Sequence, residues 1–171
     1  ELAKIAKVDS INLSNSGVTD LEPLQRLYRL KSIVASNTGV SDLLPLQKLT
    51  DVTYLDISNT QVNDLSAIKS LTGLEELHAH HTLIKSLPSG WHTPSLKKLD
   101  MDNSGIDNDM VREFLTQNSS CLVIYKTQRL KRWWAELPGD WKVIFRVYIG
   151  NEREVSTEAL HQLIEGERLY F

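Results

Sequence analysis

Cysteine is almost absent from this sequence, since Cys121 is the one thiol in 171 residues. A single thiol excludes a disulfide framework and any zinc site built from several cysteines. Long apolar runs are missing too, because no stretch approaches the roughly 18 consecutive apolar residues of a membrane span. The chain does not open with the pattern of a signal peptide. We therefore expect no membrane span and no signal segment in these residues.

The charge is close to balanced, with 19 basic and 22 acidic residues and a formal net charge of −3. This mild acidity gives no electrostatic reason to expect a nucleic-acid partner. Hydrophobic residues make up 41% of the chain and charged residues 24%, which favours a folded domain with a real core over disorder. The first residue is Glu1 rather than Met, so we expect the chain to be a piece of a longer one.

Motifs for catalysis are missing as well. The sequence has no P-loop, no glycine-rich dinucleotide fingerprint, no G-x-S-x-G elbow and no H-E-x-x-H motif. Cys121 stands beside Leu122 in an apolar run, which favours a small core residue over a nucleophile. We predict a protein that is not an enzyme and that uses no cofactor.

Leucine is the residue in excess, at 26 of 171 positions, and it recurs with a fixed period. Five units spaced by 22 residues begin at Val8, Leu30, Val52, Leu74 and Leu96. Each unit has apolar residues at its positions 1, 4, 6 and 11. A second apolar set follows at positions 14, 17 and 20, as in Leu65, Ile68 and Leu71.

This spacing predicts the local structure of each unit. Positions 4 and 6 differ by two, so they lie on one face of a short strand while positions 3, 5 and 7 face the other way. The spacing of three in the second set is typical of a 3₁₀ or loosely helical return segment. One unit cannot bury its own apolar face, so neighbouring units must stack.

The pattern over residues 8 to about 125 resembles leucine-rich repeats of the short, 22-residue kind. One column departs from the family, because hydroxyl residues replace its asparagine at position 9: Ser16, Thr38, Thr60, Thr82 and Ser104. We expect each hydroxyl to donate one hydrogen bond and to accept another from the next turn. The variant is similar to repeats common in bacterial proteins, particularly those of the Bacteroidetes type.

The resemblance implies an α/β solenoid, a right-handed superhelix whose parallel strands form a concave sheet, followed by a helical C-terminal segment. We place the leucine-rich repeat domain at residues 1–125, with a short capping helix over 1–7. A helix over about 109–117, capped by Asp107-Asn108-Asp109, and a last strand at about 121–125 complete it. Residues 126–171 form a second, tryptophan-rich helical region.

In the second region the spacing of apolar residues predicts two further helices, one around Trp141–Tyr148 and one that begins near Ser156. Its end, ALHQLIEGERLYF, matches ELAKIAKVDSINL at the start of the chain in its apolar positions, so it reads as a capping helix followed by a strand. Either the chain is one period of a tandem arrangement, or the tail is a helical cap whose similarity is accidental. Apolar side chains in 156–171 need cover, which predicts self-association through this segment or docking on the strand at 121–125.

The outward strand positions of such a solenoid form a continuous binding surface. The first two units offer small uncharged side chains there. Units three to five offer the residues that we expect to bind a partner: Tyr54, Asp56, Glu76, His78, His80, Asp100 and Asp102. We predict a non-enzymatic protein-interaction module whose partner is a protein, of unknown identity and with a basic surface.

Three alternatives stay open. His78, His80, Asp100 and Asp102 are candidate metal or small-ligand residues, although the H-x-H signature is weak and solvated polar residues explain it as well. The chain could also be a structural spacer in a tandem repeat protein. The cations and tryptophans of 129–134 occur on nucleic-acid or membrane surfaces, but we favour an amphipathic helix with its tryptophans buried on the repeats, and therefore neither of those partners.

Overall fold

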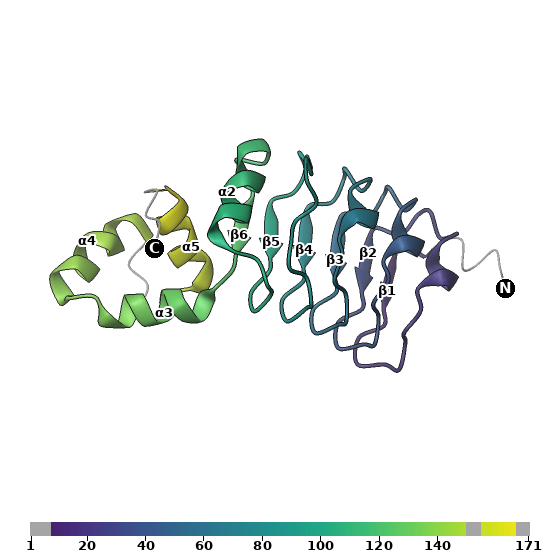
Figure 1. The fold of residues 1–171 in the computed structure, drawn as a ribbon, viewed down its shortest axis with the longest axis horizontal. Coiled ribbons are helices and arrows are strands. Elements are labelled where there is room, and N and C mark those ends of the chain that lie inside the picture. The colour runs from purple at the N-terminus through teal and green to yellow at the C-terminus, as the bar shows by residue number, and fades with distance from the viewer. Residues whose placement is uncertain (1–7, 150–154, 167–171) are drawn as a thin grey trace.

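Six short parallel strands form one open sheet in the computed structural model, which describes residues 8–149 and 155–166. The strands follow one another in chain order across the sheet (Figure 1). They are β1 (Ser10–Asn12), β2 (Ser32–Val34), β3 (Tyr54–Asp56), β4 (Glu76–His78), β5 (Lys98–Asp100) and β6 (Leu122–Ile124). The architecture is that of an α/β solenoid, as the period predicts.

The register of the sheet follows the 22-residue period. Leu55 in β3 pairs with Ile33 in β2 and with Leu77 in β4, and all three side chains are fully buried. The next apolar position is buried as well, as at Ile57. Because alternate residues of a strand point to opposite faces, the intervening side chains lie on the outer face of the sheet.

Short 3₁₀ helices return the chain in the first three units, as the spacing of three predicts. They are η1 (Glu22–Leu24), η2 (Leu44–Leu46) and η3 (Ser66–Ile68). An aspartate stands two residues before each, and its Oδ1 accepts a hydrogen bond of 2.8–2.9 Å from the first backbone N–H of the helix. The last residue of each 3₁₀ helix is buried in the core.

A tight turn follows the strand in each of the first three units, and the asparagine at position 8 of the unit stands in this turn. Asn15, Asn37 and Asn59 have φ of 55–57°, a left-handed conformation that asparagine tolerates better than most residues. The hydroxyl at position 9 then closes the corner: Thr60 Oγ1 donates to the Ile57 carbonyl at 2.6 Å. Thr38 and Thr82 repeat this bond.

One expectation about the hydroxyl column is wrong. Within the described units these hydroxyls bond inside their own turn. Each donates to the carbonyl three residues earlier, at Ser16, Thr38, Thr60 and Thr82, and Ser16 Oγ accepts from the backbone N–H of Val18 at 3.4 Å. The fifth unit departs further, since the buried Oγ of Ser104 has no partner among the described residues.

The fourth unit is irregular and holds a tryptophan in its core. No 3₁₀ helix forms within 84–91, and Trp91 is only 3% exposed there. Its ring lies 5.5 Å from that of Phe114 in α2 (Asn108–Gln117). Asn118 closes the space behind them, because its Nδ2 donates to the Trp91 carbonyl at 2.8 Å.

Helix α2 replaces the thin return segment of the fifth unit and leads into β6. Asp107 caps it, since its Oδ1 accepts from the backbone N–H groups of Asp109 and Met110 at 3.0 Å. Val111 and Phe114 form its buried side. This helix begins one residue earlier than the predicted range of 109–117.

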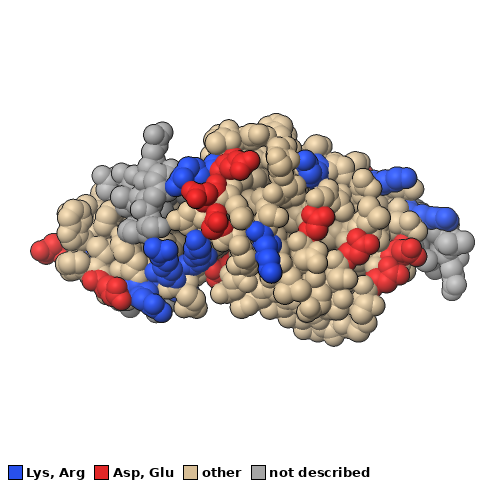
Figure 2. Space-filling model, in the orientation of Figure 1, with Lys and Arg blue, Asp and Glu red and all other residues tan. Residues whose placement is uncertain are grey.

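Three helices form the tail: α3 (Thr127–Glu136), α4 (Gly139–Ile149) and α5 (Thr157–Gly166). They lie beyond β6 at the end of the solenoid, with α4 farthest from the sheet (Figure 1). Several Lys and Arg side chains gather over this tail (Figure 2). No helix within the described residues is long and apolar enough to cross a membrane.

Helix α5 docks on β6 within the same chain. Leu160 and Leu163 are 1% and 3% exposed. The buried His161 joins the two elements, because its Nε2 accepts from the backbone N–H of Tyr125 at 3.0 Å. The expectation that Leu160 and Leu163 need cover from a second copy is therefore wrong: the last strand supplies that cover.

The tryptophans of the tail are not buried on the repeats, contrary to our expectation. Trp133 and Trp134 are half-buried and Trp141 is 51% exposed. Thr127 and Leu130 form the buried side of α3 instead. The expected capping helix at 1–7 and the expected strand at the end of the tail lie outside the described residues, and the division into domains stays a prediction.

Candidate functional site

The outer side chains of β1–β6, together with residues His80 and Asp102 just after two of the strands, form a surface that we call the sheet face. The register places Tyr54, Glu76 and Lys98 in one row. Asp56, His78 and Asp100 form the parallel row beside it. All six side chains are half-buried, so the sheet holds them in place while leaving them open to a partner.

His78 lies at the centre of this surface. Its Nε2 is 3.4 Å from Glu76 Oε2, and its Nδ1 is 3.8 Å from Asp100 Oδ2 on the next strand. The ring of Tyr54 lies 5.4 Å away on the other side. The nearby carboxylate of Asp100, and then the hydrogen bond to Glu76, raises the pKa of His78 although burial opposes the charged form.

The neighbours of His78 titrate under the same influences. Burial tends to raise the pKa of Asp100, but the nearby His78 and the hydrogen bond from the backbone of Asp102 outweigh it and hold this pKa below its usual value. Burial raises the pKa of the Tyr54 hydroxyl, and the charges of Asp56 and Glu76 add to this effect. These shifts favour an ionised Asp100 and a neutral Tyr54 on the same surface.

Two of the aspartates also shape the ends of their strands. Asp56 Oδ1 accepts from the backbone N–H of Ser58 at 2.9 Å, and Asp100 Oδ1 accepts from that of Asp102 at 3.1 Å. Such a bond to the backbone two residues on is the usual local role of Asx side chains. These aspartates are therefore oriented before any partner arrives.

Asp102 has a second role that the sequence did not reveal. Its Oδ1 accepts from the backbone N–H of Thr127 at 2.8 Å, so it caps the first turn of α3. Its Oδ2 accepts from Asn103 Nδ2 at 3.2 Å. Asp102 joins the sheet to the tail, and less of its hydrogen-bonding capacity is left for a partner.

The tail also reaches the sheet face through an ion pair. Lys98 Nζ lies 3.2 Å from Glu158 Oε1 in the first turn of α5. The backbone N–H of Glu158 itself, followed by Lys98, lowers the pKa of this carboxyl. A hollow of about 300 Å³ lies at this junction, lined among others by His80, Asp100, Lys131 and Glu158. No signal in the sequence linked Lys98 to a residue 60 positions away.

Comparison with solved structures identifies the fold of this chain. Internalin C2 from Listeria monocytogenes has a TM-score of 0.66 and 28% identity, over 73% of this chain and 54% of that one. A leucine-rich repeat protein from Leptospira interrogans has a TM-score of 0.66 and 19% identity, over 71% of this chain and 32% of that one. The chain has the leucine-rich repeat fold.

It fits a bacterial leucine-rich repeat protein, since these neighbours are bacterial and share its parallel sheet. The chain spans about half the length of internalin C2 and about a third of the Leptospira protein. No family model matches the sequence, and no curated protein is similar enough to count as a relative. The likeness to Bacteroidetes repeats stays a prediction.

The histidines of the sheet face suggested a metal site, but the structure does not bring enough metal-ligating side chains together there. Among the described residues no group of three or more His, Cys, Asp or Glu side chains is arranged to hold a metal ion. His78 faces Glu76 and Asp100, as described above, while His80 lies edge-on to the ring of His81 at 5.5 Å. The two imidazoles both lie near Asp100, but within the described chain they do not form a metal centre with it.

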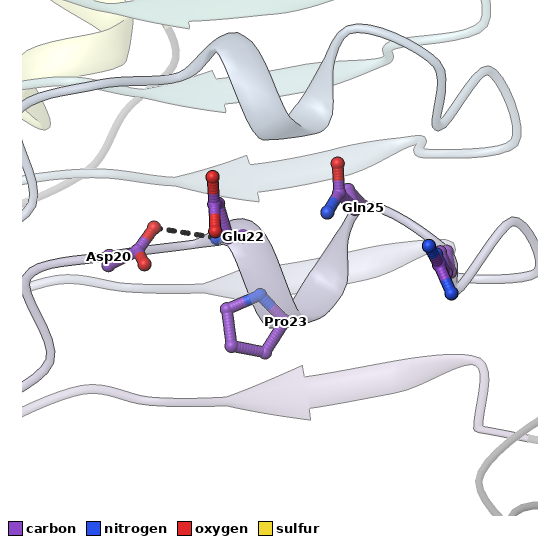
Figure 3. Close-up of a pocket in the computed structure, with 5 residues that line it drawn as sticks. Asp20, Glu22, Pro23 and Gln25 are labelled. Atoms are coloured by element: carbon purple, nitrogen blue, oxygen red, sulfur yellow. Dashed lines mark hydrogen bonds between the residues drawn. The ribbon is translucent and has the colours of Figure 1, made fainter.

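Hollows elsewhere on the leucine-rich repeat units belong to the return segments. One of about 340 Å³ beside η1 is lined by Asp20, Glu22, Pro23, Gln25 and Arg26. Asp20 there bonds the backbone of Glu22 (Figure 3), which is the capping contact that later units repeat. This hollow is thus a by-product of the repeat, and the sheet face is the better candidate site.

Proposed function

We propose that this chain is a protein-binding module that holds a basic partner on its sheet face. The observation that carries the proposal is the ordered cluster of Tyr54, Asp56, Glu76, His78 and Asp100 on three neighbouring strands. Such side chains lose little conformational freedom on binding, because the rigid sheet already positions them. The likeness to internalins supports an interaction module in general.

The chemistry of the surface indicates the kind of partner. Acidic side chains outnumber the one lysine on this part of the sheet face, so Lys and Arg side chains of a partner are favoured. Tyr54 supplies an aromatic surface beside His78, whose ring lies 5.4 Å away. Half-buried aromatic and charged groups of this kind carry most of the energy of many interfaces. His80 and Asp102 extend the surface towards the tail.

The test compares three baits in the capture of proteins from cell extracts, followed by quantitative mass spectrometry. One bait is the unaltered chain and one carries Tyr54→Ala, Glu76→Ala and His78→Ala. The third carries Tyr28→Ala, Glu22→Ala and His92→Ala, which remove the same residue types from exposed positions outside the strands. Thermal unfolding of each bait confirms that its fold is intact.

We expect at least one protein to be captured equally by the unaltered chain and by the control variant. Its captured amount should be at least tenfold lower with the variant of Tyr54, Glu76 and His78. Calorimetry with that protein, once purified, should then show the same order and a weaker affinity at high salt. Retention by all three baits alike, or loss from the third bait alone, would place binding away from the sheet face and refute the proposal.

A further inference from the structure

Helix α4 exposes a continuous apolar face. Trp141, Val143, Ile144 and Val147 are 51%, 64%, 48% and 81% exposed. Their spacing of three and four residues places them side by side on one side of the helix. The other strongly exposed large apolar residues within the described chain are Tyr28, Leu44 and Leu83, which stand in three different repeat units. A contiguous exposed patch, unlike scattered residues, marks an interaction surface.

Two half-buried side chains of α4, Lys142 and Phe145, hold this helix against its neighbours. The Phe145 ring lies 5.9 Å from the rings of both Trp133 and Trp141. Lys142 Nζ donates to the Ala135 carbonyl at 2.9 Å, which ties α4 to α3. The hairpin of α3 and α4 therefore holds its apolar face ready without needing a partner to fold it.

The charge of this hairpin is opposite to that of the sheet face. Residues 127–149 contain five cationic side chains, Arg129, Lys131, Arg132, Lys142 and Arg146, against two acidic ones, Glu136 and Asp140. The cations of α3 are exposed, and Figure 2 shows Lys and Arg side chains gathered over the tail. The sheet face offers the complement, with Tyr54 and the half-buried Val34 flanked by Asp56 and Glu76.

The two surfaces belong to one chain but cannot meet within it. Helix α4 lies farthest from β3 and β4, at the end of the molecule beyond β6 (Figure 1). Helix α5 docks between α4 and the last strand, as its packing on both elements shows. Contact between the apolar face of α4 and the centre of the sheet face therefore requires a second copy.

We infer that the α3–α4 hairpin of one copy docks on the sheet face of a second copy. The apolar face of α4 would pack against Tyr54 of the second copy, and the cations of the hairpin would lie against its Asp56 and Glu76. This inference rests on the proposed function, since it names one basic partner of the same surface. The contact joins two different surfaces, so it is head-to-tail and leaves one of each free at the ends. Copies would then add in an open series as concentration rises.

A complementation experiment tests this arrangement by light scattering from micromolar to millimolar concentration. The face variant carries Tyr54→Ala, Glu76→Ala and His78→Ala, and the hairpin variant carries Val143→Glu and Val147→Glu. Leu44→Glu with Leu83→Glu is the matched control, because it adds the same charges at exposed apolar positions in the repeats. The unaltered chain and the control should grow in mass with concentration, and less so at high salt.

Each variant alone should stay at its monomer mass of 19.4 kDa, because each lacks one of the two surfaces. An equimolar mixture should form a 1:1 dimer of about twice that mass and nothing larger, since the remaining surfaces are the disabled ones. Only a head-to-tail contact between these two surfaces gives this result.

Several results would overturn the inference: an unaltered chain that stays monomeric, a hairpin variant that associates normally, or a mixture that stays monomeric. Binding of the monomer to phosphatidylserine vesicles, lost in the hairpin variant, would assign the apolar face to a membrane instead. The capture experiment does not depend on α4, so a partner lost from the face variant but retained by the hairpin variant would leave the proposed function standing.

Discussion

In the repeat array the buried strand positions are filled again 22 residues later by equivalent side chains, whereas the tail is held by contacts that occur once. Leu55 has counterparts above and below it in the sheet. Three contacts of the tail have no such counterparts: His161 with Tyr125, Glu158 with Lys98, and Asp102 with Thr127. Stability in the array is therefore shared among neighbours, while the docking of the tail depends on a few individual residues.

The two regions also differ in what they show to solvent. The array buries its apolar residues and presents an acidic sheet face, while the α3–α4 hairpin exposes apolar residues beside cations. The array therefore buries most of its apolar side chains between its own units, whereas α4 leaves Trp141, Val143, Ile144 and Val147 exposed. Four measurements can break or sharpen this contrast.

The largest effect is expected from a cavity in the array. Leu55→Ala removes a fully buried side chain at the middle of the sheet and should lower the free energy of unfolding by about 2–5 kcal/mol. Val147→Ala on α4, where the side chain is 81% exposed, should change it by less than about 0.5 kcal/mol. Urea unfolding of both variants measures the difference, and equal effects would contradict the contrast.

The next effect should appear in the tail alone. His161→Ala removes the contacts of the imidazole with the backbone of Tyr125 and should weaken the docking of α5 by about 1–3 kcal/mol. Amide hydrogen exchange should then rise in α5 and β6 while β2–β4 keep their protection. The exposed neighbour provides the control, as Gln162→Ala. If exchange rose throughout the array, array and tail would unfold as one unit.

A smaller effect is expected from the hydroxyl column. Thr60→Val keeps the shape of a side chain that is 2% exposed but removes its bond to the Ile57 carbonyl, at a cost of about 1 kcal/mol. Ser16→Ala removes the same bond at an exposed corner of the first unit, where water can replace it. The shift in the urea midpoint should therefore be clearly larger for Thr60→Val.

The smallest effect concerns pH. The pKa of His78 is raised by the nearby carboxylate of Asp100 and by the hydrogen bond to Glu76, so the stability from these pairs is fully present below the unfolded pKa of about 6.5 and is lost as pH rises through the higher folded pKa. NMR titration should place the His78 midpoint above about 6.5, and Asp100→Asn should lower it. An unchanged midpoint in that variant would mean that Asp100 is not the cause.

The same titration affects the sheet face as a binding surface. When pH falls through the raised pKa of His78, this histidine gains a positive charge among the carboxylates. The affinity for a basic partner should therefore decrease over the same range in which the stability from the pairs of His78 increases. Measuring both on one protein separates the two roles of His78.

Most of the array could be predicted because its information is local and repeated. Positions 4 and 6 gave the strands, the spacing of three in the second apolar set gave the 3₁₀ helices, and Asp107 gave the start of α2. The same period placed Tyr54, Glu76 and His78 on one surface. The hydroxyl column was predicted only in part, because its partner depends on the left-handed corner that Asn59 and its equivalents form.

The sequence by itself determined the stack of units, since an apolar pattern with a 22-residue period can be buried only by placing equivalent strands side by side. The tertiary structure alone decided how the tail meets that stack. Thr127 finds Asp102 across 25 residues and Glu158 finds Lys98 across 60, and no periodic signal links such pairs. Glu158 reaches Lys98 because α5 covers the last strand, and Thr127 reaches Asp102 because α3 begins directly after β6 beside the preceding strand.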